Sequence, residues 1–537
     1  NRFMAIAPLS LRPDYWEKFQ VQESDLEYLY NFLLEVETPQ TPQELALAVV
    51  DERIRNEKAK LEKEQQAGGD LYLPKGQYKA GQTLVFPARA YEQGKITAVR
   101  EGHNPELPPF SVIDVTFGSG EKRAFASELQ EHMLNQPITI ATDDPSMNPG
   151  LVMKKYSQKI IASLTESLEA NEDLVRIAGR WFPRALLVDV NIGHLNLAEA
   201  VLDMEGGGPL PTKAILDQIE LPSDSNLKLT EFSLNLALQE DGRFDEVGPS
   251  GEVLWFLRRL EPSPVQEPPS YLKYRPVEYD HEMVREAMKL LDPLVCDELE
   301  PNAGGEVNPD AEEVRIALVF AHWRAGTLPL CCRVDQFLPT AYESPRVRFT
   351  FIDGDSGQKI DGWIVREHRY AYGLRDWYVA QGVFPGSIIR IQKGKTQGEV
   401  IIRAEKRRPG REWIRTALVG ADGGIVFAML KQLIATTFDD HLATAIPDLA
   451  ALDQIWSGGA KQRGPLEPTV IAMMRELAKL NPQGSVHAQD LYATVNLVRR
   501  TPPGPILSLL IEKPWSAHMG DLYFRLNENI QEENAHD

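Results

Sequence analysis

The residue types best suited to chemistry in this sequence are cations interleaved with aromatic side chains, gathered in one stretch of the chain. Arginine and lysine bind backbone phosphates and release counterions, while tyrosine and tryptophan stack on bases or pack along sugars. The pattern therefore predicts a nucleic-acid surface. We expect phosphate contacts from Arg366, Arg369, Arg375, Arg390, Lys393, Lys395, Arg407 and Arg408, and sugar or base contacts from Tyr372 and Trp377.

The total charge of the chain hides this local excess of cations. The 537 residues carry 57 Lys and Arg against 78 Asp and Glu, a formal charge of −21. Residues 331–415 alone hold sixteen Lys and Arg against ten Asp and Glu, or +6, so the rest of the chain carries −27. Because acidic surfaces repel DNA, these eighty-five residues become the expected binding region.

No group of residues has the types and spacing of a catalytic or metal site. Residues 281–285 begin like a zinc-protease helix, but Arg285 stands where the second His is required. Residues 353–357 read DGDSG, as in a calcium loop, yet Gln358 and Ile364 replace the glycine and the bidentate glutamate, which favours a hairpin turn. We therefore expect no catalytic residue, no metal and no cofactor.

Cysteine usage and hydropathy suggest the compartment. Cys296, Cys331 and Cys332 lack metal-ligand spacing, and a disulfide framework is not expected from so few. Cys331 and Cys332 should be buried thiols that open a strand. The most apolar stretches are short and interrupted, so no membrane partner is expected. These features predict a cytoplasmic protein.

In the N-terminal part, changes in the period of the apolar residues indicate where helices end and strands begin. Helices are expected at 24–37 and 41–66, followed by short strands between Gly and Pro turns. GQTLVF and QGKITAVREG resemble the Tudor or SH3-like barrel of DNA-repair helicases and of transcription-coupling factors that dock on RNA polymerase. The resemblance implies RNA polymerase or another protein as partner. The strands are expected at 83–86, 95–99, 111–117 and 122–125.

One order of elements, three helices closed by two strands, occurs twice and resembles a winged helix-turn-helix. The N-terminal helix pair is considered as a third, degenerate copy. The first copy has helices at 196–205, 212–219 and 227–240 and strands at 243–247 and 253–259, after a long helix at 154–177; the second has helices at 468–480, 487–495 and 506–512 and a wing that ends at 521–526.

The third helix of a DNA-reading winged module needs polar side chains on its outer face. Residues 227–240 offer few of them beside Glu231 and Glu240, and 506–512 has almost no polar face. Arg499 and Arg500 are then the expected phosphate contacts of the C-terminal copy. Contact with protein is the favoured interpretation of the acidic copy, and for the C-terminal copy both roles stay open.

The basic stretch should be β-rich. RFTFIDGDSGQKIDGWIV and YGLRDWYVAQGVFPGSIIRI resemble the DNA-binding pseudobarrel of plant transcription factors and restriction-enzyme recognition domains, although Ser387 replaces the usual acidic residue. The resemblance implies double-stranded DNA as partner; the alternative is a basic barrel whose arginines pair with acidic neighbours. Strands are expected at 330–334, 347–352, 360–365, 388–392 and 400–405, after helices at 282–291 and 311–324.

These interpretations predict an α+β multi-domain chain with winged helix-turn-helix modules and small β-barrels. Its expected parts are an N-terminal helical region (1–70), a Tudor-like barrel (71–135), a helix with an acidic winged helix (150–262), a proline-rich linker (263–277), a helical connector (278–326), a basic pseudobarrel-like domain (327–416), a mixed connector (417–460) and a C-terminal winged helix (461–530).

We expect a non-enzymatic, transcription-associated DNA-binding protein of bacterial regulatory type. Its basic β-domain would contact DNA, while the winged and Tudor-like modules would contact partners. The alternative is an acidic protein–protein scaffold that does not bind DNA. A third hypothesis is a subunit that supplies target recognition to a nuclease on another chain.

Overall fold

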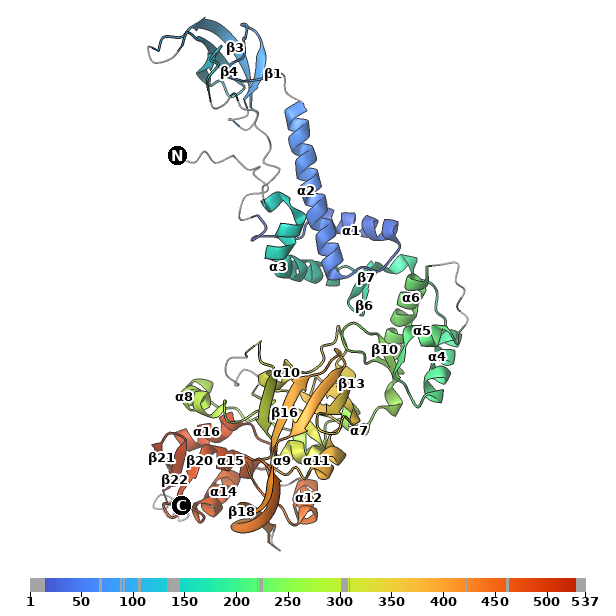
Figure 1. Cartoon of the computed structure of the whole chain (residues 1–537), viewed down its shortest axis with the longest axis vertical. Helices are drawn as coiled ribbons and strands as arrows, with labels where there is room; N and C mark the ends of the chain where they lie inside the picture. The colour runs from blue at the N-terminus through green and yellow to red at the C-terminus, as the bar shows by residue number, and fades with distance from the viewer. Residues whose placement is uncertain are drawn as a thin grey trace. The chain divides into compact units, whose positions relative to one another are not determined.

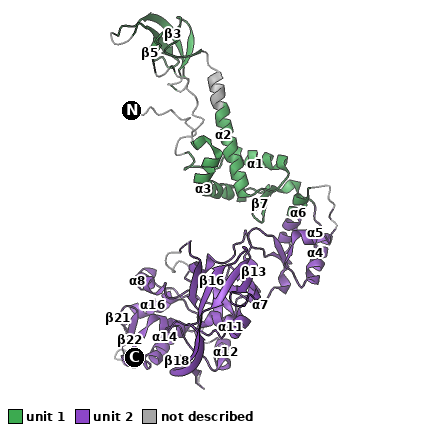
Figure 2. Cartoon of the chain, viewed as in Figure 1, with its two compact units in different colours: residues 1–188, 223–232 green, residues 189–222, 233–537 purple. Residues whose placement is uncertain are grey.

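The computed structural model is a mixed α+β structure that divides into two compact units (Figure 2). Unit 1 comprises residues 1–188 and 223–232, and unit 2 comprises residues 189–222 and 233–537. No described helix is long and apolar enough to cross a membrane. The structure describes residues 15–66, 70–86, 89, 92–104, 108–132, 135, 145–219, 221, 226–300, 308, 310–420, 423–459 and 463–527.

Unit 1 contains an N-terminal module of three helices and a hairpin. Helix α2 begins at a capping box, in which the Glu44 carboxylate accepts from the Thr41 backbone N–H at 2.7 Å and the Thr41 hydroxyl accepts from the Glu44 N–H at 3.3 Å. The elements are α1 (Glu23–Val36), α2 (Pro42–Gln66), α3 (Pro149–Glu169), β6 (Leu174–Ile177) and β7 (Arg180–Pro183).

The expected helix at 154–177 is wrong in its last turns. Helix α3 ends at Glu169, and the chain then forms the β6–β7 hairpin around Ala178 and Gly179, whose φ angles are 49° and 71°. Gln40, between α1 and α2, pairs with Trp181 of β7. The module therefore runs helix, bridging strand, helix, helix, hairpin, with a separate sheet inserted between its second and third helices (Figure 1).

The inserted sheet contains all four strands predicted for this region. An aromatic cluster that includes Tyr72, Phe86 and Phe117 fills its interior. The Glu128 N–H donates to Gly76 and the Leu129 N–H to Pro74, at 3.1 and 2.9 Å, which joins one edge to the other. The strands lie in the order β1 (Asp70–Leu71), β2 (Thr83–Phe86), β3 (Glu92–Glu101), β4 (Ser111–Phe117), β5 (Lys122–Ser127).

A middle module has the predicted order of helices and strands, and it belongs to unit 2 except for residues 227–232 of its third helix, which belong to unit 1. Its core packs Leu202, Ile215 and Leu238 against Trp255, whose indole N–H donates to Asn235 at 2.9 Å. Its sheet order is β8-β10-β9. The elements are α4 (Ile192–Met204), β8 (Leu210–Pro211), α5 (Thr212–Leu216), α6 (Leu227–Glu240), β9 (Phe244–Glu246) and β10 (Leu254–Leu257).

The C-terminal module repeats this order, and its sheet follows the same pattern, β20-β22-β21. The N-terminal, middle and C-terminal modules therefore share one arrangement. In each of them the strand or bridge that follows the first helix pairs with the last strand of the module. The elements are α14 (Glu467–Ala478), β20 (Ser485–His487), α15 (Ala488–Val495), α16 (Pro503–Glu512), β21 (Ser516–Gly520) and β22 (Tyr523–Leu526).

Between these modules lies a seven-stranded half-barrel, in the order β11-β16-β17-β13-β14-β15-β12. Only β13 and β17 run parallel. Helix α11 (Arg375–Gln381) packs on its core through Trp377 and Tyr378. The strands are β11 (Glu313–Ala317), β12 (Thr327–Pro329), β13 (Arg346–Asp353), β14 (Lys359–Val365), β15 (Tyr370–Tyr372), β16 (Ile388–Lys393) and β17 (Glu399–Ala404).

Four of the five strands predicted here are confirmed, and two other assignments are wrong. The expected helix at 311–324 is divided between β11 and the short α9 (Phe320–Ala325), because Val314 and Ile316 alternate into the half-barrel core. The expected strand at 330–334 is instead α10 (Cys332–Asp335), preceded by β12.

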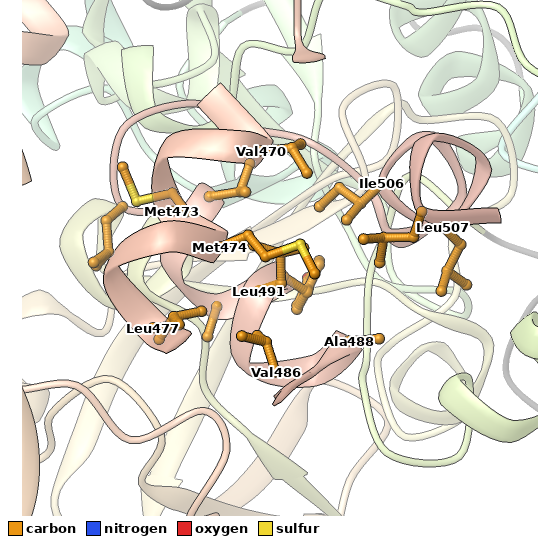
Figure 3. Close-up of a cluster of buried hydrophobic side chains, with 14 of the residues drawn as sticks. Val470, Met473, Met474, Leu477, Val486, Ala488, Leu491, Ile506 and Leu507 are labelled. Atoms are coloured by element: carbon orange, nitrogen blue, oxygen red, sulfur yellow. The ribbon is translucent and has the colours of Figure 1, made fainter. Parts of the chain in front are cut away.

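A long antiparallel ribbon, β18 (Lys406–Val419) and β19 (Ile425–Thr436), leaves the half-barrel. Its tip shares one core with the C-terminal module, α8 (His281–Leu291) and α12 (Leu449–Gly458). Val470, Met473 and Leu507 are among the side chains that interlock in this core (Figure 3).

A buried charge network links the half-barrel to the C-terminal module. The Arg500 guanidinium, 1% exposed, donates to Asp297 at 2.6 Å and lies 2.8 Å from Glu298. Glu298 also contacts His322 of α9 at 2.7 Å, and the Tyr492 hydroxyl donates to Asp297 at 2.6 Å. Arg500 is therefore an internal ion-pair residue, and its expected phosphate contact is wrong.

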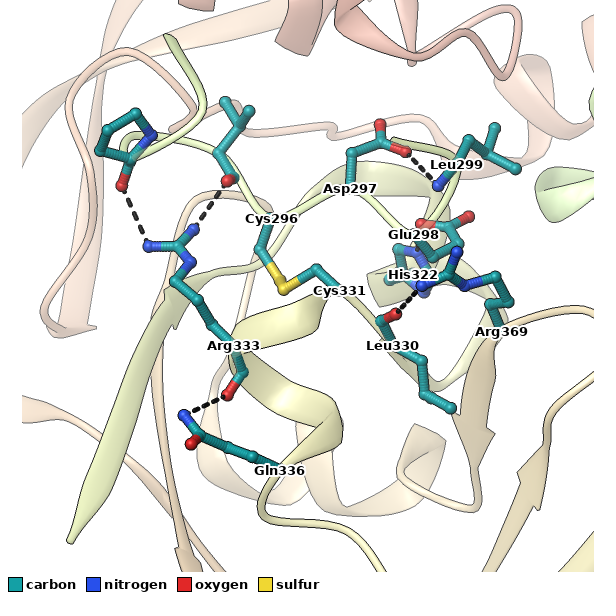
Figure 4. Close-up of a disulfide and its surroundings, with 12 residues drawn as sticks. Cys296, Asp297, Glu298, Leu299, His322, Leu330, Cys331, Arg333, Gln336 and Arg369 are labelled. Atoms are coloured by element: carbon teal, nitrogen blue, oxygen red, sulfur yellow. Dashed lines mark hydrogen bonds and ion pairs between the residues drawn. A yellow bond between two sulfur atoms is a disulfide. The ribbon is translucent and has the colours of Figure 1, made fainter. Parts of the chain in front are cut away.

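The same segment is fixed covalently. Cys296 and Cys331 form a disulfide beside Asp297 and Glu298 (Figure 4), so the expectation of two buried thiols is wrong for Cys331. Cys332 is free and half-buried. Disulfides form and persist in oxidising compartments, so this one gives no support to the cytoplasmic location. That location stays a prediction from the sequence.

The proline-rich segment 263–277 lies against folded parts of unit 2. It forms α7 (Ser263–Gln266) and a single 3-10 turn, η6 (Ser270–Leu272), and it buries Val265 and Leu272. The Tyr370 hydroxyl of β15 donates to the Pro264 carbonyl at 2.5 Å. The segment is therefore packed on the surface of the half-barrel.

Substitution of Arg500 by Met should lower the free energy of unfolding by about 3–5 kcal/mol, because two buried carboxylates lose their cation. Chemical denaturation of the full chain measures this. The control Arg525→Met, at an exposed position of β22, should change it by less than about 0.5 kcal/mol. A loss below about 1 kcal/mol in Arg500→Met would show that the network contributes little.

Glu246 gives the middle module a pH dependence. Burial raises its pKa to about 7, and the charges of Glu343 and Asp245 add to this. The folded state then holds a proton that the unfolded state releases, so this part of the stability is lost as pH rises from about 4.5 through about 7. Glu246→Gln should therefore gain stability relative to wild type across that range, measured by denaturation at pH 5, 6, 7 and 8. A constant difference would contradict the assignment.

Candidate nucleic-acid interface

The ribbon β18–β19 carries several exposed cations beside an exposed tryptophan. Its strands pair from Lys406 with Thr436 to Val419 with Ile425, and the register shifts between Lys406 and Gly410. Pro409 lies within this bulge, where its missing N–H costs no ladder hydrogen bond. The bulge holds the basic run clear of the regular ladder.

The half of the ribbon nearer its hairpin turn is anchored, and we call it the inner half because it is buried against the C-terminal module. Ile414, Ala417 and Phe427 are buried, and the Arg415 guanidinium donates to Asp490 and to the His441 carbonyl, each at 2.6 Å. Burial opposes ionisation of Asp490, but the hydrogen bond with His441 and the charge of Arg415 hold its pKa below the usual value. A buried ion pair therefore fixes β18 to the C-terminal module.

The half of the ribbon nearer the half-barrel, which we call the outer half because it is exposed, presents one mixed face. Arg411 and Trp413 of β18 lie opposite Leu433 and Lys431 of β19, and all four point to the same side because side chains alternate along strands. Trp413 is 60% exposed, and the Lys431 ammonium lies 5.2 Å from its ring centroid. Arg408 and Arg411 pair with no carboxylate in the described part of the chain. We call Arg408, Arg411, Trp413 and Lys431 the ribbon patch.

Eight of the ten residues predicted from sequence fall at two ends of the half-barrel. The β14–β15 turn lies at the end where β17 begins, because β17 is parallel to β13 and β14 is antiparallel to it. The Arg366 side chain there donates to the Pro339 carbonyl at 2.6 Å, and that of Arg369 to the Leu330 carbonyl at 3.2 Å (Figure 4). Lys393 and Lys395, on the β16–β17 connection, belong to the same end and are exposed.

The opposite end holds Trp377, Arg407 and Arg408, and Arg375 begins the helix that carries Trp377. Asp353 accepts from the Trp377 indole at 3.0 Å, and Asp355 lies 3.1 Å from Lys406, the residue before Arg407. Burial would raise the pKa of Asp353, but backbone and indole hydrogen bonds hold it lower than usual, so the carboxylate stays ionised. Trp377 is 4% exposed and has no face for a base, so we leave it out of the interface.

The remaining two residues lie between the ends. Tyr372 is half-buried on β15. Arg390 of β16 stands in a row with Arg315 and Arg403 of the neighbouring strands, and it pairs with Glu313 at 2.6 Å. Arg407 likewise pairs with Glu412. Part of the local positive charge is thus neutralised within the fold.

Trp413 and Lys431 were missed by sequence reasoning. A signal was present, because two stretches with strand character flank the glycine-rich residues 420–424 and predict a hairpin. No group of three or more His, Cys, Asp or Glu among the described residues is arranged to hold a metal ion. No family model, curated protein or solved structure gives a significant match to the chain.

The alternation of the ribbon predicts opposite effects at adjacent positions. Trp413→Ala should change the free energy of unfolding by less than about 1 kcal/mol because the ring is mostly exposed, whereas Ile414→Ala should cost about 2–5 kcal/mol because Ile414 is buried. Denaturation of both variants measures this. A large loss in Trp413→Ala would mean that the ring is covered.

Proposed function

We propose that this protein binds double-stranded DNA through the outer half of ribbon β18–β19, in a non-enzymatic, transcription-associated role. The observation that carries the proposal is the ribbon patch: an exposed indole with Lys431 over its ring, Arg411 on the same face and exposed Arg408 in the adjoining bulge. A two-stranded ribbon fits the major groove of B-DNA, where its cations reach phosphates on both sides. The indole can pack along a sugar or a base.

The order of elements in the half-barrel, from which the ribbon leaves, also supports the proposal. Its strand pair β13–β14, aromatic-led helix α11 and following strand β16 come in the order of the pseudobarrel that the sequence resembles. Trp377 and Lys406 both contact the segment that follows β13, at the end that leads into the ribbon. DNA held by the ribbon would therefore also lie near the Arg407–Arg408 run and near Arg375, two residues before Trp377.

The repeated modules support the winged-helix interpretation through their shared element and strand order. Burial argues against groove contact by the third helix of the middle and C-terminal modules. In α6 the polar side chains of Thr230, Ser233 and Asn235 are 3–7% exposed, and α16 is buried along most of its length. Neither helix then offers a polar face to a groove. We propose RNA polymerase or another protein as the partner of these modules and of the inserted sheet.

The acidic scaffold is the second candidate. Pairing of Arg390 with Glu313 and of Arg407 with Glu412 favours it, since these arginines already have internal anions. Exposed Trp413 and Leu433 would then meet a protein instead of DNA.

Binding of the full chain to mixed-sequence duplex DNA separates the two candidates, measured by fluorescence anisotropy at several salt concentrations. DNA contact predicts a log–log salt slope of several negative units, about −0.9 for each neutralised phosphate. The triple variant Arg408→Gln, Arg411→Gln, Lys431→Gln should make the slope shallower by about 2–3 and weaken binding at least tenfold.

The matched control Lys122→Gln, Arg123→Gln, Lys479→Gln removes the same charge from exposed positions elsewhere and should leave the slope unchanged. Charge reversal at Arg366 and Arg369 should have less effect than the ribbon variant. No binding by the wild type supports the scaffold, and equal loss in both triple variants would show nonspecific attraction.

A further inference from the structure

A second basic site lies in unit 2, apart from the ribbon patch. It is a cavity of about 300 Å³ formed by the chain after η6, by α12, by the segment before α14 and by the loop before α16. No carboxylate lines it among the described residues. The lining residues are Ser270, Lys273, Tyr274, Arg275, Trp456, Arg463, Arg499 and Arg500.

Backbone carbonyls hold three of these cations in place. The side chain of Arg499 donates to Gly464 at 2.6 Å, that of Arg275 to the Arg463 carbonyl at 3.2 Å, and that of Arg463 to Gly458 at 3.0 Å. A carbonyl orients a guanidinium without cancelling its charge. The three side chains are thus pre-organised and still cationic.

The charge balance of the wall is uneven. Asp297 and Glu298 form ion pairs with Arg500 and neutralise its charge. Arg499 is 4% exposed, and burial together with the charge of Arg275 lowers its pKa. Lys273 has only a loose, exposed ion pair with Glu267 at 3.9 Å. An incoming anion would relieve the repulsion.

We propose that this cavity binds the phosphate groups of a small phosphorylated ligand. Arg275 and Arg463, both exposed, supply forked donors that match phosphate oxygens, and Lys273 supplies a mobile ammonium at the rim. The volume admits a pyrophosphate group. Tyr274, half-buried in the wall, gives an adjoining aromatic surface. The proposal does not depend on DNA binding by the ribbon.

Isothermal titration of the full chain with inorganic pyrophosphate tests it. Wild type should bind, and Arg275→Gln with Arg463→Gln, both at exposed positions, should bind at least tenfold more weakly. The control Arg525→Gln, outside the cavity, should bind as wild type does. The proposal is overturned if wild type does not bind pyrophosphate at about 10 mM, a concentration that would reveal even weak binding. It is also overturned if the double variant binds with the affinity of wild type.

A duplex-DNA arm distinguishes a small ligand from the DNA backbone as the source of phosphate. The double variant should keep wild-type affinity for duplex DNA, and pyrophosphate should not displace DNA from the wild type. Loss of DNA affinity in the double variant, together with displacement by pyrophosphate, would make the cavity part of the DNA interface and overturn the small-ligand assignment. Failure of the ribbon variants to affect DNA binding would leave the cavity result intact.

Discussion

The guanidinium of Arg500, sealed between Asp297 and Glu298, is the contact on which the arrangement of unit 2 depends. A buried cation is tolerable only when its anions are held in place, and here a disulfide at Cys296 and the His322 contact hold them. The C-terminal module thereby becomes one body with the half-barrel. That body fixes the inner half of the ribbon, through Arg415, and forms the wall of the basic cavity beside Arg499.

The arginines of this chain divide into two classes that sequence composition does not separate. Arg500, Arg415 and Arg346 are buried or half-buried and end on carboxylates, so their charge is used to hold modules together. Arg408 and Arg411 lie on an exposed ribbon whose other face is anchored. The positive charge available to a phosphate is therefore smaller than the local excess of +6, and it is carried by particular exposed side chains such as these two.

Local periodicity was enough to predict most elements, including the strands β13, β14, β16 and β17 and the helices of the repeated modules. It failed where short elements meet, as at β6 and β11, because a few alternating residues also fit a helical pattern. The disulfide between Cys296 and Cys331 spans 35 residues, and the Arg500–Asp297 contact spans 203. No local pattern encodes such pairings, so the sequence could suggest the basic region but not which of its cations are neutralised.

Photo-crosslinking tests the central claim most directly, because it locates DNA on the chain without relying on a variant. A duplex with photoreactive groups along both strands would be crosslinked to the full chain and the joined peptides identified by mass spectrometry. The account predicts crosslinks within Lys406–Val419 and Ile425–Thr436, concentrated at the outer half of the ribbon. Crosslinks confined to the helices of the repeated modules, or to the β14–β15 end of the half-barrel, would contradict it.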